Sequence, residues 1–250
     1  MKIGFIGTGH IAAPMARFLA TKGHEICVSD RNSDTAALLK ARIGAQVADN
    51  QTVVDGSEVV FLCLRPQIAV RALEPLTFRT DQKIVSVMAG VSRQELETLC
   101  APCTDFVQTI PIGFLESGGC PLPAFGNDEL LSELFAPENP VIAVASQAGL
   151  NAHFALCAFL PGVLDLMATG AQWLGQQTGD AKSAEFYTAQ LLSGFLADMP
   201  KQKAGQLARE RDALATAGTL SLQMTSGLRD GNAHIVLSDI LDQIGERLRK

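Results

Sequence analysis

The chain has 250 residues, of which 47% are hydrophobic and 18% charged, and its formal net charge is −6. This composition is typical of a globular protein and excludes a disordered one, and the length suffices for one large domain or two unequal ones. The acidic balance, without a basic patch, argues against nucleic acid as a partner.

Neither the first residues nor the longest apolar run predicts secretion or a membrane-spanning segment. After Met1 the sequence enters a short strand pattern, so no signal peptide is expected. The longest apolar run, residues 154–164, contains Pro161 and ends at Asp165. It is too short to span a bilayer, so we expect a buried helix and no membrane partner. The six cysteines are scattered along the chain, and a reducing, cytoplasmic setting is the default expectation.

The first thirty residues follow the order of a dinucleotide-binding unit. The stretch KIGFI (2–6) predicts a strand, GTGHIA (7–12) a glycine turn, and APMARFLATKG (13–23) a helix that stops at its glycine. A second strand, HEICVSD (24–30), ends in an acidic residue. Because the Gly-x-Gly-x-x-Ala pattern lies between a strand and a helix, we interpret it as a dinucleotide fingerprint.

Each small residue of the fingerprint has a physical task. Gly7 permits a tight turn, Gly9 lets a pyrophosphate approach the backbone, and Ala12 lets the helix pack on its strand. The start of that helix offers free N–H groups to the phosphates. The cofactor residues predicted from this turn are Gly7, Thr8, Gly9, His10, Ile11 and Ala12.

The residues after the second strand bear on the choice of dinucleotide. A carboxylate at Asp30 would accept hydrogen bonds from the ribose hydroxyls of NAD, whereas Arg31 and Asn32 would form a site for the 2′-phosphate of NADP. We favour NADP and keep NAD as the alternative.

The alternation of strands and helices continues to about residue 147. Strands are predicted at 59–64, 83–90, 105–111 and 140–145, with helices after the first two. This order predicts an α/β fold with a Rossmann-type, doubly wound, mostly parallel sheet, whose ligand lies along the carboxyl ends of the strands. Two further clusters should therefore reach the cofactor: Cys63, Leu64, Arg65 and Pro66, and Met88, Ala89 and Gly90.

Beyond residue 147 only helical patterns remain. We expect a Rossmann domain over 1–147 and an all-α domain over 148–250, with a helix broken or kinked near Pro161 and others over 183–199 and 234–248. This half is small for its apolar content. Another subunit is expected to cover its apolar faces, which predicts a homodimer or higher homo-oligomer.

The helical half is poor in conventional acids and bases. Residues 150–168 contain no lysine, and His153 is more simply explained as a core residue than as a catalyst. Reduction of a protonated imine would need no strong acid, only a shaped pocket and a hydroxyl near the nitrogen. Thr219 and Ser221, at the predicted start of a late helix, could supply it, or they could simply favour the helix start.

The pair Cys100 and Cys103 is explained more simply as structural than as a redox or metal site. A redox dithiol would stand at the start of a helix, whereas CAPC closes the helical pattern SRQELETL, and no second ligand pair suggests zinc. We interpret both cysteines as structural.

Several of these stretches together resemble the pyrroline-5-carboxylate reductase family. KIGFIGTGHIA is similar to its fingerprint, VVFLCLRPQ to its Arg-Pro-Gln strand end, and KIVSVMAGVS to its Ala-Gly-Val strand end. ATAGTLSLQMTSGLRDGNAH resembles its late helix and is the most specific match. The resemblance implies a Rossmann domain, a helical dimerisation domain, NAD(P)H as hydride donor and a cyclic imine acid reduced to proline.

The departures from the family pattern concern the substrate side. Ile112 stands where the family has asparagine, and SQAGLNAH (146–153) replaces its Ser-Gly-Ser-Gly-Pro-Ala segment. Either Thr219 or Ser221 matches the family hydroxyl, depending on register. A hydroxyacid-type dehydrogenase with the same domain order, and a non-catalytic NADP-binding regulator, remain as alternatives.

Overall fold

The computed structural model describes residues 1–249 and divides the chain into two compact units. The first unit is Met1–Phe154 together with the chain end from Arg247, and the second is Ala155–Glu246. The sequence placed a domain boundary at 147, whereas the contacts of the structure place the division seven residues later, inside a helix, and return the chain end to the first unit.

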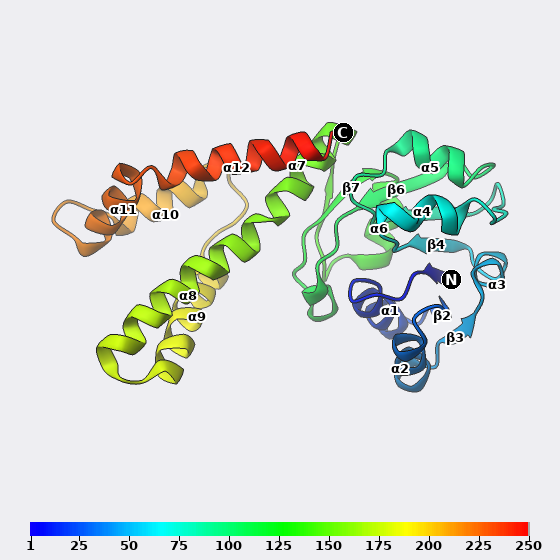
Figure 1. Ribbon diagram of the computed structural model, residues 1–250, viewed down its shortest axis with the longest axis horizontal. Helices are drawn as coiled ribbons and strands as arrows, with labels where there is room; N and C mark the ends of the chain where they lie inside the picture. The colour runs from blue at the N-terminus through cyan, green and yellow to red at the C-terminus, as the bar shows by residue number, and fades with distance from the viewer. Residues whose placement is uncertain (250) are drawn as a thin grey trace. The chain divides into compact units, whose positions relative to one another are not determined.

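The first unit is built on one eight-stranded sheet with the strand order β3-β2-β1-β4-β5-β6-β7-β8 (Figure 1). All neighbouring strands are parallel except β6 and β7, which are antiparallel, so the predicted mostly parallel α/β sheet is confirmed. The strands are β1 (Lys2–Ile6), β2 (Glu25–Ser29), β3 (Gln46–Ala48), β4 (Val59–Leu62), β5 (Lys83–Ser86), β6 (Asp105–Thr109), β7 (Leu122–Gly126) and β8 (Val141–Ala143).

Helices bury both faces of this sheet. One apolar cluster joins the sheet to α1, α2 and α6, and the other joins it to α3, α4 and α5. Phe5 and Phe61 stack at 4.7 Å between ring centroids in the first cluster. The helices are α1 (Ala12–Thr21), α2 (Ser33–Ile43), α3 (Asn50–Asp55), α4 (Pro66–Leu73), α5 (Arg93–Leu99), a 3₁₀ turn η1 (Gly113–Ser117), α6 (Asp128–Phe135) and α7 (Gln147–Cys157).

Two strands of the sheet had no signal in the sequence. β3 has only three residues, none of them fully buried, so it lacks the apolar run of a central strand. β7 carries Pro123 and ends at Gly126, residues that ordinarily weaken a strand prediction. Tertiary pairing with β2 and β6 makes both of them strands.

The second unit consists of helices: α8 (Phe159–Thr178), α9 (Ala181–Asp198), α10 (Gln206–Leu214), α11 (Leu220–Asp230) and α12 (Ala233–Arg247). The predicted interruption near Pro161 is confirmed, since α7 ends at Cys157 and α8 begins at Phe159. A proline cannot donate to the carbonyl four residues earlier, which is that of Cys157.

The helices α8 and α9 form an antiparallel hairpin (Figure 1). Gly179 ends α8 in the left-handed conformation, with φ of +72°. Asp180 then caps α9, and its carboxylate accepts hydrogen bonds from the Ser183 N–H at 3.0 Å and from the Ser183 hydroxyl at 2.6 Å. The local sequence therefore specifies this turn.

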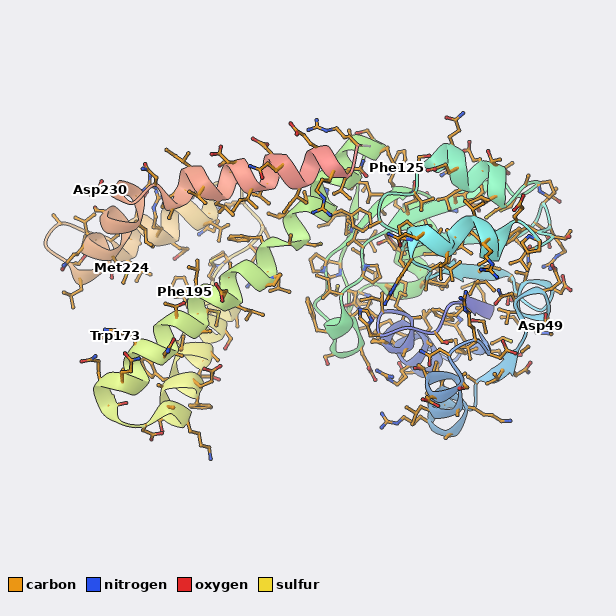
Figure 2. The ribbon with its side chains drawn as sticks, viewed as in Figure 1. Asp49, Phe125, Trp173, Phe195, Met224 and Asp230 are labelled. Carbon is orange, nitrogen blue, oxygen red and sulfur yellow. The ribbon has the colours of Figure 1, made fainter. Side chains whose placement is uncertain are left out.

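The second unit has almost no core of its own. Across 155–246, every residue of which the structure describes, the buried apolar side chains are Ala155, Ala171 and Ala184. Trp173 on α8 is 62% exposed and Met224 on α11 is 67% exposed (Figure 2). A unit with so much exposed apolar surface requires a cover.

The expectation of a buried helix over 154–164 is wrong for the single chain. Phe159, Leu160 and Leu164 are all exposed, because no other helix of the unit covers them. By length and composition alone, the stretch Gln147–Thr178 could cross a membrane. An 18-residue window within it has a mean hydropathy of 1.7, and 11% of that window is buried. The periodicity of the sequence shows that this face is apolar, but it does not show what covers it.

Candidate active site

A cleft of about 510 Å³ opens at the carboxyl ends of β1, β2 and β4. It lies where the strand order reverses, because β2 flanks β1 on one side and β4 on the other. This switch point is where open α/β sheets bind their ligands. The cleft is lined by Gly7, Thr8, Gly9, Arg31, Asn32, Ser33, Cys63, Leu64, Arg65 and Ile68.

The two glycines of the first turn have different structural reasons. Gly7 has φ of +96°, and a Cβ placed on it would lie 2.5 Å from the backbone oxygen of Cys63. Gly7 therefore serves the turn and the close approach of two loops. A Cβ on Gly9 would meet no atom within 4 Å. Since Gly9 lines the cleft, its missing side chain leaves open space rather than relieving a clash within the protein.

Hydrogen bonds hold the first two turns together. The N–H of Gly7 donates to the hydroxyl of Ser29 at 2.9 Å, and Ser29 is 1% exposed at the end of β2. The side-chain amide of Asn32 donates to the backbone oxygen of Thr8 at 3.1 Å. Its carbonyl oxygen accepts from the Thr35 N–H at 3.4 Å and caps α2. The glycine turn is thus preorganised by β2 and by the loop that follows it.

The start of α1 is open to a ligand. No side chain caps this helix, whose first residue is Ala12, and Gly9 from the preceding turn lines the cleft. The uncapped first turn of a helix presents unpaired N–H groups and a partial positive charge. Of the other residues predicted here, His10 is exposed, Ile11 precedes the helix, and Ala12 is buried against the sheet.

The cleft is cationic. Arg31 and Arg65 line it, and neither guanidinium forms an ion pair with a described side chain. Asp30 is exposed and does not belong to the described lining. Its N–H donates to Ala48 of β3 at 3.0 Å, which fixes the backbone but leaves the carboxylate free. The described lining therefore holds two positive charges and no carboxylate.

The remaining predicted residues lie further along the sheet edge. Pro66 and Gly90 line a groove of about 420 Å³ between α4 and α5. Met88 is buried in the core cluster on that face, and Ala89 is half-buried beside it. These residues follow β4 and β5, so they continue the carboxyl edge beyond the cleft. Contact of any of these residues with a cofactor stays a prediction.

The first part of the chain matches a model of a known enzyme family, described as NADP oxidoreductase coenzyme F420-dependent, over residues 2–90. Relatives cover much more of the chain. Pyrroline-5-carboxylate reductase 3 of Danio rerio is 24% identical over 100% of this chain and 91% of its own length. Pyrroline-5-carboxylate reductase 3 of Mus musculus is 28% identical over 87% of this chain and 84% of its own length.

Along most of its length the chain is similar to pyrroline-5-carboxylate reductases, at 24–28% identity. Its fold agrees with this similarity. A pyrroline-5-carboxylate reductase from Streptococcus pyogenes has a TM-score of 0.84 at 20% identity, covering 99% of this chain and 98% of that one. The Plasmodium falciparum enzyme, solved with NADP bound, has a TM-score of 0.83 at 12% identity, covering 99% and 97%.

Imine reductases share the same fold at a greater distance. The enzyme from Pseudomonas sp. has a TM-score of 0.65 at 18% identity, covering 97% of this chain and 87% of that one. The pyrroline-5-carboxylate reductases and the imine reductases therefore share the fold of this chain.

The late helix that carries the family-like motif is α11. Thr219 is its N-cap: its hydroxyl oxygen accepts from the Leu222 N–H at 3.1 Å and its hydroxyl donates to the Thr216 oxygen at 2.7 Å. Ser221 lies in the first turn, is exposed, and its hydroxyl has no hydrogen-bond partner among the described residues. The structure thus gives Thr219 a local role and leaves the Ser221 hydroxyl free.

Other candidate nucleophiles and bases are accounted for locally. His153 on α7 holds its Nδ1 at 2.8 Å from the Gly149 oxygen, which fixes that nitrogen as the protonated one. Cys100 ends α5, and burial raises the pKa of its thiol to about 12. Burial also raises the pKa of the Cys103 thiol, which donates to the Gln82 oxygen at 2.9 Å. Neither cysteine is poised as a thiolate.

Sequence reasoning missed two residues that line the cleft and one that supports it. Ser33 and Ile68 line the cleft at the starts of α2 and α4, and the Ser29 hydroxyl accepts a hydrogen bond from the Gly7 N–H. Asn32 precedes a helical pattern, and an asparagine in that place signals the start of a helix. This signal would have added Ser33, the next residue, to the predicted cofactor residues. No signal in the sequence distinguishes Ser29 from any other buried strand residue.

Proposed function

We propose that the chain transfers a hydride from NADPH to a small cyclic imine acid, reducing pyrroline-5-carboxylate to proline or a related ring, as a cytoplasmic enzyme of proline biosynthesis. The observation that carries this proposal is the match to pyrroline-5-carboxylate reductases along the whole chain, together with a cleft at the switch point. The higher TM-scores with those enzymes than with the imine reductase favour the cyclic imine acid.

The predicted cofactor residues would divide the dinucleotide among them. The glycine turn and the open start of α1 would hold the pyrophosphate, and the residues after β5 would lie beside the nicotinamide. Arg31, Asn32 and Ser33 would receive the 2′-phosphate, assisted by Arg65. The absence of a carboxylate from the described lining supports NADPH over NADH, because a carboxylate there would repel that phosphate.

Hydride transfer to a protonated imine would need the protein to bind and orient the two reactants, but not to supply an acid. The nicotinamide would supply the hydride to the imine carbon, the electron pair of the C=N bond would move to nitrogen, and the nitrogen would keep its proton. Thr219 or Ser221 would hydrogen-bond that nitrogen and hold the ring in place. Ser221 is favoured by its free hydroxyl, and Thr219 by its match to the Gly-Thr pair of the family motif.

We propose further that the second unit works as a homodimer, through the exposed apolar residues of α8, α9 and α11. On α8, Leu160 and Leu164 lie four residues apart and form an apolar stripe, as do Tyr187, Leu191 and Phe195 on α9. A second copy of the same chain presents the same apolar stripes, so the two copies can cover each other. A second copy rather than lipid is the proposed cover, because the curated relatives match this segment as part of a full-length enzyme.

The test is oxidation of NADPH, followed at 340 nm, with pyrroline-5-carboxylate, other cyclic imines and 2-oxo acids. Turnover of cyclic imines is the expected result. Turnover of 2-oxo acids alone would make the protein a hydroxyacid-type dehydrogenase. NADPH binding without turnover of any of them would make it a regulator.

A further inference from the structure

A second cavity lies at the carboxyl end of β5, beyond the predicted nicotinamide cluster. Its volume is about 470 Å³, and we call it the tail cavity because the end of the chain forms one wall. All its lining residues belong to the first unit. They are Gly90, Val91, Ser92, Glu95, Gln147, Ala148, Asn151, Leu248 and Arg249.

A chain of three hydrogen bonds builds this cavity from distant segments. The N–H of Arg93, at the start of α5, donates to the side-chain oxygen of Gln147 at 3.1 Å. The side-chain nitrogen of Gln147 donates to the side-chain oxygen of Asn151 at 3.3 Å. The side-chain nitrogen of Asn151 then donates to the backbone oxygen of Leu248 at 3.0 Å, across 97 residues of sequence. The loop after β5, the start of α7 and the chain end are thereby held as one wall.

This hydrogen-bonded chain leaves donors unused. Each side-chain amide nitrogen carries two hydrogens, and Gln147 and Asn151 each use one of them in the chain. Arg249 adds a guanidinium that forms no ion pair with a described side chain. Free N–H groups next to an unpaired guanidinium are suited to a carboxylate, which can accept several hydrogen bonds at once.

The opposite charge is also present. Glu95 lines the cavity, and its carboxylate accepts hydrogen bonds from the N–H and the hydroxyl of Ser92, both at 2.7 Å. These bonds hold it as an anion at a fixed place, as the N3 residue of a capping box. A simple anion would be repelled by Glu95, whereas a molecule with both a carboxylate and a cationic nitrogen matches both charges. Val91 and Ala148 supply apolar surface for a hydrocarbon ring.

We propose that the tail cavity binds the carboxylate of a small dipolar imino or amino acid through Arg249, with Gln147 and Asn151 as further donors. This inference rests on the proposed function and deepens it, since it names the residues that would distinguish an imine acid from an unsubstituted imine. Gly90 belongs both to the tail cavity and to the predicted nicotinamide cluster, which places the acid next to the reacting ring. Besides donating to the carboxylate, Asn151 positions Arg249, because its side chain holds the backbone of the preceding residue, Leu248.

The experiment compares two ring substrates in two variants. Arg249→Gln removes the guanidinium, and Arg247→Gln removes an exposed arginine that does not line the cavity. With pyrroline-5-carboxylate, Arg249→Gln should raise the KM about 10- to 100-fold, the effect of one lost charged hydrogen-bonding partner. With 1-pyrroline, the same ring without its carboxylate, the KM should stay within about twofold of the parent. Arg247→Gln should behave as the parent with both rings.

Equal losses with both rings, or no loss with either, would overturn the inference while the proposed function stands. If the parent enzyme reduces neither ring, the proposed function falls and calorimetry with L-proline in the presence of NADP decides the inference. L-Proline binding that is lost in Arg249→Gln and kept in Arg247→Gln supports it, and no binding by the parent overturns it. Asn151→Leu should reproduce part of the KM effect and speed hydrogen exchange at Leu248 and Arg249, which a role confined to α7 would not do.

Discussion

A Cβ placed on Gly7 would lie 2.5 Å from the backbone oxygen of Cys63, whereas one placed on Gly9, two residues on, would meet nothing within 4 Å. The first contact joins the turn after β1 to the end of β4 and belongs to the fold. The second position faces open space in the cleft, where we expect the ligand. Substitutions at these two glycines of one motif should therefore have different effects: one on stability and the other on ligand binding.

Gly7→Ala should destabilise the protein, and Gly9→Val should not. Alanine at position 7 meets a backbone atom and an unfavourable φ, at a cost on the order of 2 kcal/mol or more in the free energy of unfolding. Valine at position 9 should leave unfolding unchanged but weaken NADPH binding more than about tenfold, by occupying phosphate space. Denaturant unfolding and fluorescence titration measure the two effects, and unchanged NADPH binding by Gly9→Val would contradict the assignment of the cleft.

Arg31→Ala should discriminate between the two dinucleotides. If Arg31 holds the 2′-phosphate, its loss weakens NADPH by about 1–3 kcal/mol and leaves NADH nearly unchanged. Lys40→Ala, on α2 but outside the cleft, is the matched control. Equal weakening of both dinucleotides, or of neither, would show that Asp30 governs the choice and that the protein uses NAD.

Removal of each hydroxyl at the start of α11 should distinguish a role in helix capping from a role in the reaction. Thr219→Ala removes an N-cap and should lower the free energy of unfolding by about 1 kcal/mol, whereas Ser221→Ala removes no hydrogen bond to a described residue and should leave stability unchanged. Whichever hydroxyl binds the substrate nitrogen should cost about tenfold to a thousandfold in turnover when it is removed, with NADPH affinity unchanged. Parent-like turnover in both variants would make the opening of α11 purely structural.

Trp173→Glu should weaken self-association. A charge placed in a covered apolar face is costly, so the variant should shift the dimer towards monomer by more than about tenfold in dissociation constant. The neighbouring change Gln172→Glu adds the same charge where a polar side chain already stands. Sedimentation velocity over a range of concentrations measures both, and a parent protein that is monomeric at all concentrations would remove the basis for the dimer.

The buried thiol of Cys100 should make stability fall at alkaline pH. Its pKa is raised to about 12 by burial, whereas in the unfolded chain a cysteine ionises near pH 8.5. Between these values the unfolded state binds fewer protons than the native state, so the free energy of unfolding declines by up to about 1.4 kcal/mol per pH unit. Urea unfolding from pH 8 to 11 should show a shallower decline in Cys100→Ala than in the parent.

Much of the first unit could be predicted from the sequence because its signals are local. Short apolar runs, glycines at fixed intervals and a proline at the start of α4 are properties of neighbouring residues, and β1, β2, β4, β5 and β6 follow from them. β3 and β7 could not be predicted, since pairing with β2 and β6 makes them strands. The same limit hid Ser29, whose importance comes from a hydrogen bond to Gly7 across 22 residues.

By itself, the sequence determined the alternating strands and helices, the glycine turn and the helical second half, because backbone conformation and hydrophobic periodicity are local in origin. The tertiary structure alone decided that Arg31 and Arg65 line the cleft while Asp30 does not. It alone also brought Leu248 to Asn151. Contacts between segments so far apart depend on how the whole sheet and its helices pack, and no short stretch of sequence contains that information.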